Sequence, residues 1–389
     1  MKYLFILCAF FLFACSKSLD RLSPQATTQL SIKEKQSCSF DMTEFNMIKR
    51  PPVNNDVARN KPKLQITGGN GGTTSANVIL LDFNGQVVSG TSWNVNGDIT
   101  CAPANLTDAE ISVIFQRIAT DYIPFNVIVT TDETVYAKAN PYKRIRVIVT
   151  ESWEWYGKAG GVSFLNSFTW GDNTPCFVFS SLLNYNLKNI AEACSHEAGH
   201  TLGLRHQAAY DANGVKLSEY NWGAGSGEIG WAPIMGAGYN QNLTLWHNGP
   251  NSISSTTLQN DIDIISGIVG MVNDDYSNTT SNAASLSTSL QGIINNASDV
   301  DYFSVNFTTT KTISITPQNV GINNAGSNLD MSLGVYNSQG VLLSTINDPS
   351  VLSVSANLPP GSYYIAAGTT DNPFVTKYGM ESKYTISIN

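Results

Sequence analysis

Apolar positions in the middle of the chain follow two different periods. After Thr107 and Glu110, which have the spacing of a helix capping box, apolar residues recur at intervals of three and four until Pro124. Further helices are expected from Leu187 onward and over residues 258–269. Short apolar runs typical of buried strands lie at residues 77–83, 125–131, 144–150 and 175–180. This order predicts a mixed α/β unit.

From residue 283 the pattern changes to short alternating runs separated by turns, as in residues 312–316 and 384–388. A period of two, repeated in several short segments, predicts strands with one buried face. We therefore expect an all-β sandwich over residues 283–389. Residues 273–282 are rich in Asp, Ser, Asn and Thr and are expected to form a linker.

Residues 1–15 have the pattern of an export signal. Lys2 precedes an apolar run of about a dozen residues, which is too short to span a bilayer and fits a signal peptide. Its end, Leu12-Phe13-Ala14-Cys15, resembles the bacterial lipobox, in which the cysteine is lipidated. We expect an exported cell-envelope lipoprotein, at the outer membrane or the cell surface, that is held in a membrane by lipid on Cys15. Ordinary signal cleavage and secretion is the alternative.

Residues 16–75 are polar and show no sustained period, so they are expected to form a tether or a pro-segment. The whole chain of 389 residues carries 30 acidic and 22 basic residues, a balance that does not suggest a nucleic-acid partner. No later stretch is long and apolar enough to cross a membrane. A monomer is the expected state.

The stretch from His196 to His206 reads H-E-x-x-H-x-x-G-x-x-H and contains three of the four histidines of the chain. On a helix, the imidazoles of His196 and His200 project from one face one turn apart, so that two nitrogens can bind one metal ion. Gly203 permits the sharp left-handed turn that ends such a helix. The turn brings His206 round to the same ion.

Three imidazole nitrogens leave one coordination position for water, which is the arrangement of a catalytic zinc. Glu197 follows the first ligand and is placed to act on that water as a general base rather than to bind the metal. The alternative is a surface helix that carries two histidines by chance. It does not account for Gly203 and His206.

This motif resembles that of the metzincin metallopeptidases, whose second mark is a turn with a methionine beneath the metal. Residues 230–239 read GWAPIMGAGY, and Met235 would place its thioether under the imidazoles as packing. An ordinary core methionine is the alternative. In some branches of the family a tyrosine two residues after the methionine can contact the zinc. Here Tyr239 is four residues on, so it is a candidate to hydrogen-bond a developing oxyanion, with a structural role as the alternative.

The resemblance covers roughly residues 76–272 and implies a twisted mixed sheet that carries the active-site helix. It implies that the segment after Gly161 is an edge strand that holds an extended peptide, with an interior hairpin as the alternative. The implied activity is that of a zinc-dependent endopeptidase acting on extracellular or envelope proteins.

Residues 283–389 resemble the bacterial pre-peptidase C-terminal domain, a small β-sandwich. The residues that carry the resemblance are Asp299-Val300-Asp301-Tyr302-Phe303, Asn328-Leu329-Asp330 and the run LPPGSYY at 358–364. Asp299, Asp301 and Asp330 are candidate ligands of Ca²⁺, because this cation takes oxygen ligands. Acids that form turns are the alternative.

Whether the cysteines form disulfides depends on whether the protein is exported to an oxidising compartment. Cys176 and Cys194 flank the connection from a strand to the zinc helix and are candidates for a disulfide in an oxidising compartment. Cys38 and Cys101 would then be the remaining pair. A thiolate of Cys38 that binds the zinc and keeps the enzyme latent is the alternative.

A rival interpretation is a membrane-anchored lipoprotein whose zinc site is vestigial and whose sandwich binds a glycan or a protein. A peptidase that acts only on glycosylated or surface-attached proteins is a third. Glu197 favours an enzyme, because a purely structural zinc site has no use for a carboxylate at that position.

Overall fold

The computed structural model describes residues 35–37, 50–51, 64–69, 77–318 and 327–389. The expected signal peptide, the lipidation site Cys15 and the residue Cys38 lie outside these residues, as does most of segment 16–75. Within the described part of the chain, no helix is long and apolar enough to cross a membrane.

A seven-stranded mixed sheet forms the centre of the first unit, in the order β1-β8-β9-β7-β3-β6-β2. The four inner strands β9, β7, β3 and β6 run parallel to one another, whereas β1, β8 and β2 pair antiparallel with their neighbours. The strands are β1 (Lys35–Ser37), β2 (Thr67–Gly69), β3 (Asn77–Asp82), β6 (Val127–Thr130), β7 (Arg144–Thr150), β8 (Gly161–Phe164) and β9 (Cys176–Phe179).

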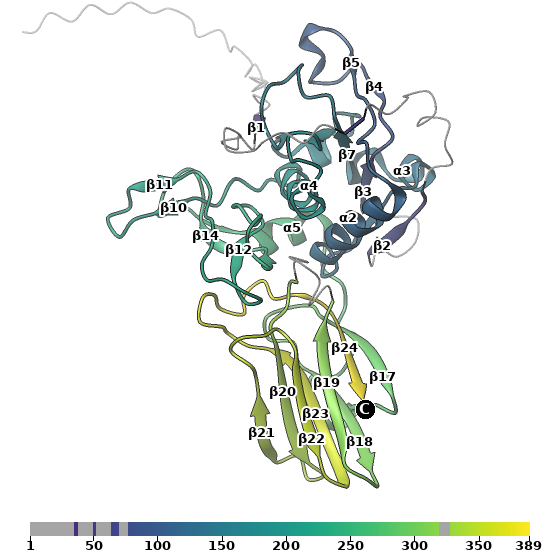
Figure 1. Cartoon of the computed structure of the whole chain (residues 1–389), viewed down its shortest axis with the longest axis vertical. Helices are drawn as coiled ribbons and strands as arrows, with labels where there is room; N and C mark the ends of the chain where they lie inside the picture. The colour runs from purple at the N-terminus through teal and green to yellow at the C-terminus, as the bar shows by residue number, and fades with distance from the viewer. Residues whose placement is uncertain (1–34, 38–49, 52–63, 70–76, 319–326) are drawn as a thin grey trace, which may run out of the picture. The chain divides into compact units, whose positions relative to one another are not determined.

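Side chains of the sheet alternate between two buried faces. On β3, Ile79 and Leu81 belong to the core that α2 (Asp108–Asp121) and α4 (Leu187–Thr201) form with the sheet. Val78 and Leu80 pack instead with Tyr136 of α3 (Glu133–Lys138). The sheet is therefore covered on both faces, which explains why its strands read as continuous apolar runs. Figure 1 shows α2 and α4 side by side, with β3 and β7 between them and α3.

Most of the predicted elements of this unit are confirmed. The capping box is present, because the Thr107 side chain accepts a hydrogen bond from the Glu110 N–H, and the Glu110 carboxylate accepts one from the Thr107 N–H. The expected helix over 258–269 is wrong at its start. Residues Leu258–Asn260 form strand β15, and α5 begins at Asp261. The reason is that β15 pairs with β14 (Asn248–Pro250), while the Asn260 side chain caps α5.

Short strands occupy the connections of this unit. They are β4 (Val87–Val88), β5 (Ile99–Thr100), β10 (Ala209–Tyr210), β11 (Lys216–Ser218), β12 (Trp231–Pro233) and β13 (Leu243–Leu245). The strands β12 and β13 pair parallel, an arrangement that matters for the site described below.

The C-terminal unit is a sandwich of two sheets, as predicted. One sheet has the order β16-β18-β23-β20-β21 and the other β17-β24-β19-β22. Phe303, Ile313 and Ile365, on strands of both sheets, are fully buried in one shared core. The strands are β16 (Ala284–Ser285), β17 (Ser289–Ile294), β18 (Asp301–Phe307), β19 (Lys311–Pro317), β20 (Met331–Asn337), β21 (Leu342–Ile346), β22 (Val354–Leu358), β23 (Gly361–Thr369) and β24 (Ser382–Ile388).

The predicted disulfide between Cys176 and Cys194 is wrong for this structure. Both are free thiols that are fully buried in the core between the sheet and α4, and Cys101 is free and buried as well. Burial raises the pKa of the Cys176 and Cys194 thiols well above the usual value. In the structure these side chains fill space in the core as small apolar groups.

Candidate metal centre

The helix α4 and the turn after it position three histidines. The Asn186 side chain caps the start of α4 by accepting a hydrogen bond from the Asn189 N–H at 3.0 Å. At the other end Gly203 has a φ of 99°, as the sequence predicted, and the chain reverses. A Cβ at Gly203 would lie 2.7 Å from Oδ1 of Asn166, so a larger residue would need this side chain to move as well as a strained backbone.

His196, His200 and His206 form one cluster. One ring nitrogen of each lies within 4.8 Å of the others, and all three side chains are buried. The ring centroids of His196 and His200 are 4.6 Å apart. The ring centroid of His206 lies 5.2 Å from that of His196 and 4.8 Å from that of His200. The sequence therefore identified this cluster correctly.

The Nδ1 atom of each imidazole faces an oxygen that can only accept a hydrogen bond. His196 donates to the carbonyl of Ile234 at 2.8 Å, and His200 donates to that of Leu204 at 2.6 Å. These partners place the proton on Nδ1 and leave Nε2 with a free lone pair.

The third imidazole is oriented by a carboxylate. His206 Nδ1 lies 3.0 Å from Oε1 of Glu219, whose other oxygen accepts a hydrogen bond from Lys216 Nζ at 2.8 Å. The hydrogen bond from His206, together with Lys216, lowers the pKa of Glu219 to about 2. The carboxylate is therefore ionised at neutral pH.

The three Nε2 atoms are buried and have no hydrogen-bond partner among the residues that the structure describes. Three unpaired nitrogen acceptors that face one another fit a divalent metal of the zinc type. Burial, with the nearby histidines, lowers the pKa of His196 to about 3 and that of His200 well below its usual value. These two imidazoles are neutral at physiological pH, as metal binding requires.

Glu197 lies beside the cluster and is fully buried. Ser163 on β8 donates a hydrogen bond from Oγ to Oε2 of Glu197 at 2.5 Å. A Cβ at Gly161, on the same strand, would lie 2.6 Å from Cγ of Glu197. The strand therefore leaves room for the carboxylate and holds it in place.

Met235 lies against α4, the helix that carries His196 and His200. A Cβ at Gly199 would approach Sδ of Met235 to 2.7 Å, so the thioether packs on α4 at Gly199. Met235 belongs to the core that α2 and α4 form with the sheet. Its assignment to a methionine turn beneath a metal stays a prediction.

The tyrosine ring that contacts the cluster is Tyr220. Its centroid lies 4.6 Å from that of His206 and 6.4 Å from that of His196. Tyr239 is partly buried and packs against the core of α2 and α4, and its proposed role towards an oxyanion stays a prediction. Sequence reasoning missed Tyr220, Glu219 and Ser163, because no spacing relative to the histidine motif marks them.

The strand β8 is not the edge of its sheet. On one side it pairs with β9, and on the other it pairs antiparallel with β1, with Gln36 opposite Ser163. The expected edge strand thus has an extended segment of the same chain on its outer side.

Two of the three candidate calcium ligands lie together. Carboxylate oxygens of Asp299 and Asp301 are within 4.8 Å of each other and of Asp274, which belongs to the linker. Both sandwich residues are buried, and each has one oxygen without a hydrogen-bond partner in the described chain. Asp330 is not in this group, because its carboxylate oxygens do not lie within this distance of the other three; it accepts a hydrogen bond from Asn372 instead. The structure therefore replaces Asp330 with Asp274 in the candidate set.

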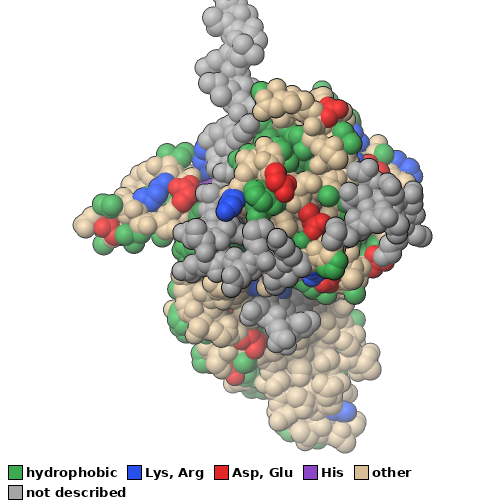
Figure 2. Space-filling view, turned by 45° about the horizontal axis from the view of Figure 1, so that its top comes forward, with side chains coloured by type: hydrophobic (Ala, Val, Ile, Leu, Met, Phe, Trp, Pro, Cys, Tyr) green, Lys and Arg blue, Asp and Glu red, His purple; other side chains and the backbone are tan. Residues whose placement is uncertain are grey.

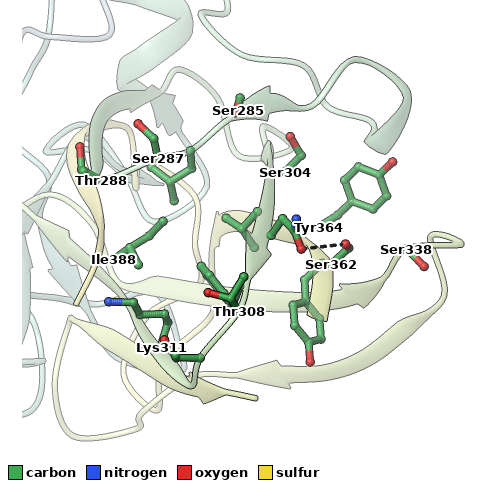
Figure 3. Close-up of a pocket in the computed structure, with 16 residues that line it drawn as sticks. Ser285, Ser287, Thr288, Ser304, Thr308, Lys311, Ser338, Ser362, Tyr364 and Ile388 are labelled. Carbon is green, nitrogen blue, oxygen red and sulfur yellow. Dashed lines mark hydrogen bonds between the residues drawn. The ribbon is translucent and has the colours of Figure 1, made fainter. Parts of the chain in front are cut away.

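A groove of about 690 Å³ lies on the sandwich (Figure 3). Hydroxyl groups line much of it, with one ammonium group from Lys311 and no carboxylate. Ser287, Thr288 and Ser304 lie along one side of the groove in the view of Figure 3, opposite Lys311 and Thr308. Figure 2 shows few charged side chains on the visible face of the sandwich, in its lower part.

Comparisons with known proteins give little. No protein-family model matches the chain, and no curated protein matches it. Among solved structures, the pre-peptidase C-terminal domain of a collagenase from Bacillus anthracis matches 28% of this chain and 93% of that domain, with 17% identity and a TM-score of 0.20. A periplasmic inhibitor of g-type lysozyme from Aeromonas hydrophila matches 26% of this chain and 84% of its own, with 12% identity and a TM-score of 0.17. Both likenesses are weak, and neither indicates a function for this chain.

Proposed function

We propose that this chain is a zinc-dependent endopeptidase of the metzincin type. The observation that carries the proposal is the set of three buried Nε2 atoms that face one another, each with its proton fixed on Nδ1. The buried carboxylate of Glu197 beside them supports a catalytic rather than a structural site. The contact of Met235 with α4 supports the family assignment.

His196, His200 and His206 would hold the ion. When bound, zinc polarises the scissile carbonyl and lowers the pKa of water. Glu197 takes the proton from the attacking water and gives it to the leaving amine. Ser163 keeps one carboxylate oxygen in a fixed direction, so that the other is directed to the reaction.

The substrate class is an extended peptide. The pairing of β1 with β8 supports this, because it places an extended segment antiparallel beside the strand that holds Glu197. Protein and peptide substrates are thus the partners we propose. We further propose export and lipidation at Cys15, which would place the enzyme at a membrane surface in the cell envelope.

The test is peptide cleavage by purified full-length protein and by Glu197→Gln. The amide keeps the size of the side chain but cannot accept the proton, so the rate should fall by about 10²–10⁴ while bound zinc is unchanged. The matched control is Glu154→Gln, which changes an exposed glutamate and should cleave at the wild-type rate. Cleavage by Glu197→Gln at the wild-type rate would contradict the proposal. A proteome-derived peptide library serves as substrate, because casein alone would miss a narrow specificity.

The second candidate function is a binding lipoprotein with a vestigial zinc site. The groove on the sandwich favours it, since hydroxyl groups without a carboxylate suit a neutral glycan. Full-length Glu197→Gln on a glycan array tests this function apart from catalysis. Retained glycan binding, with no peptide cleavage by the wild type in zinc, would favour this candidate over the peptidase.

A further inference from the structure

One segment of the C-terminal unit continues the small sheet beside the metal centre. The N–H of Ser327 donates to the carbonyl of Asn242 at 2.9 Å, and the N–H of Thr244 donates to the carbonyl of Ser327 at 3.1 Å. Ser327 thus pairs parallel with Leu243 of β13, on a strand that also pairs with β12. The sandwich therefore supplies the outer backbone contact of this sheet.

The next residue, Asn328, is 3% exposed and makes two hydrogen bonds with one amide. Its Nδ2 donates to Oδ1 of Asp121 at 2.9 Å and to the carbonyl of Thr244 at 2.7 Å. Asp121 is the last residue of α2, and its other oxygen accepts a hydrogen bond from Oγ of Ser195 at 2.5 Å. Ser195 directly precedes the first metal ligand, His196. One path from the sandwich to the metal centre therefore runs through buried side chains.

A second path runs through the backbone of β13. The N–H of Ile234 donates to the carbonyl of Leu245 at 2.8 Å, and the carbonyl of Ile234 accepts the Nδ1 proton of His196. The position of β13 thus sets the position of the acceptor that orients this imidazole. The Asn328 amide donates a hydrogen bond to the carbonyl of Thr244, which precedes Leu245 on β13. Both paths end at His196.

We propose that Asn328 is a positioning residue for His196, so that the C-terminal unit is part of the metal centre rather than a separate appendage. This inference rests on the proposed zinc site. Without the amide, a buried carboxylate oxygen and a buried carbonyl each lose a donor. Both groups would shift to recover one, and the residues that orient His196 would shift with them. Removal of groups that orient a metal ligand typically costs 10- to 100-fold in metal affinity or activity.

A role in stability alone would look different, and the chain offers a matched control. Ser382, also in the sandwich and buried, donates a hydrogen bond to the carbonyl of Thr120 at 3.2 Å. This bond also joins the sandwich to the end of α2, but it ends on a backbone carbonyl and is not made to the Asp121 carboxylate that accepts from Ser195. Ser382→Ala should therefore lower the melting temperature without changing zinc binding.

The experiment compares full-length wild type, Asn328→Ala and Ser382→Ala. The dissociation constant of zinc is measured by competition with a chelator, and the melting temperature is measured on zinc-free protein. We expect Asn328→Ala to weaken zinc binding by about tenfold or more. In zinc-saturated protein kcat should fall while KM for a peptide changes little. Asn328→Ser, which keeps one donor, is measured in parallel. It should also weaken zinc binding, and it provides the test if the alanine variant does not fold.

Unchanged zinc dissociation and kcat in Asn328→Ala or Asn328→Ser, with only a lower melting temperature, would overturn the inference. An equal loss of zinc affinity in Ser382→Ala would overturn it as well. Failure of the proposed peptidase function is seen separately, as absence of peptide cleavage by zinc-loaded wild type. The zinc measurement does not depend on that activity.

Discussion

Ser163 on β8 and Glu197 on α4 are joined by a hydrogen bond from the serine Oγ to the carboxylate Oε2, over 2.5 Å. The same hydroxyl lies 2.9 Å from the backbone carbonyl oxygen of Glu197. The serine hydroxyl has one proton, which the carboxylate of the proposed general base accepts in the shorter of these two contacts. In Ser163→Ala, kcat should fall about tenfold, because a hydrogen bond to a charged group is lost, while zinc stays bound.

The matched control for Ser163 is Ser167→Ala. Ser167 is also buried, but its hydroxyl has no hydrogen-bond partner in the described residues. Its loss should leave kcat unchanged. Steady-state kinetics and zinc content of both variants check the prediction. Equal kcat in Ser163→Ala and Ser167→Ala would show that Ser163 does not position Glu197.

Glu219 should strengthen zinc binding through His206. Glu219→Ala removes the acceptor that orients the imidazole, and the zinc dissociation constant should rise about tenfold or more. Glu219→Gln keeps an oxygen acceptor and should lose less. Lys216→Ala removes the other partner of the carboxylate and is the control, with zinc binding close to wild type. A larger loss in Lys216→Ala than in Glu219→Ala would argue against the assignment.

The segment that contains β1 should compete with substrate. A chain that begins at residue 64 lacks β1 and leaves the outer side of β8 open, so kcat/KM for peptides should rise, mainly through a lower KM. A chain that begins at residue 35 keeps β1 and should behave like the full-length protein. Peptide hydrolysis by the three proteins is the measurement. An unchanged KM after removal of residues 1–63 would show that substrate does not use this side of β8.

The spacing of the histidine motif was sufficient to predict the ligand cluster, since the period of a helix and one glycine turn determine it locally. Glu219 and Ser163 reach the site from other elements, so no local pattern reveals them. The disulfide prediction failed because Cys176 and Cys194 were paired only on their places in the sequence, on either side of a strand-to-helix connection. Such places do not determine how two thiols pack in the core. Asp330 was grouped with Asp299 by motif, whereas the fold brings the linker residue Asp274 to that place.

Calcium should stabilise the protein more at high pH. Burial, with repulsion from Asp299, raises the pKa of Asp301 to about 8, and burial raises that of Asp299 to about 6. Because the folded state holds these protons more tightly than the unfolded state, the stability that they contribute is present below pH 3.8 and is lost as the pH rises through about 6 to 8. Calcium binds the ionised carboxylates, so its effect on the melting temperature should be larger at about pH 8 than at about pH 5.

Melting curves with and without millimolar calcium check this prediction on zinc-loaded protein. Asp301→Asn should abolish the effect of calcium. Asp330→Asn, which changes a carboxylate outside the group, should keep it. A calcium effect that disappears in Asp330→Asn and persists in Asp301→Asn would contradict the grouping.

The coordination of the metal itself shows whether the three histidines form a zinc site. Zinc analysis and X-ray absorption at the zinc edge on folded full-length protein should find one zinc ion per chain, bound by three imidazole nitrogens, and His206→Ala should lose the third nitrogen. A folded protein that takes up no zinc, or a zinc environment that His206→Ala leaves unchanged, would contradict a zinc site formed by His196, His200 and His206.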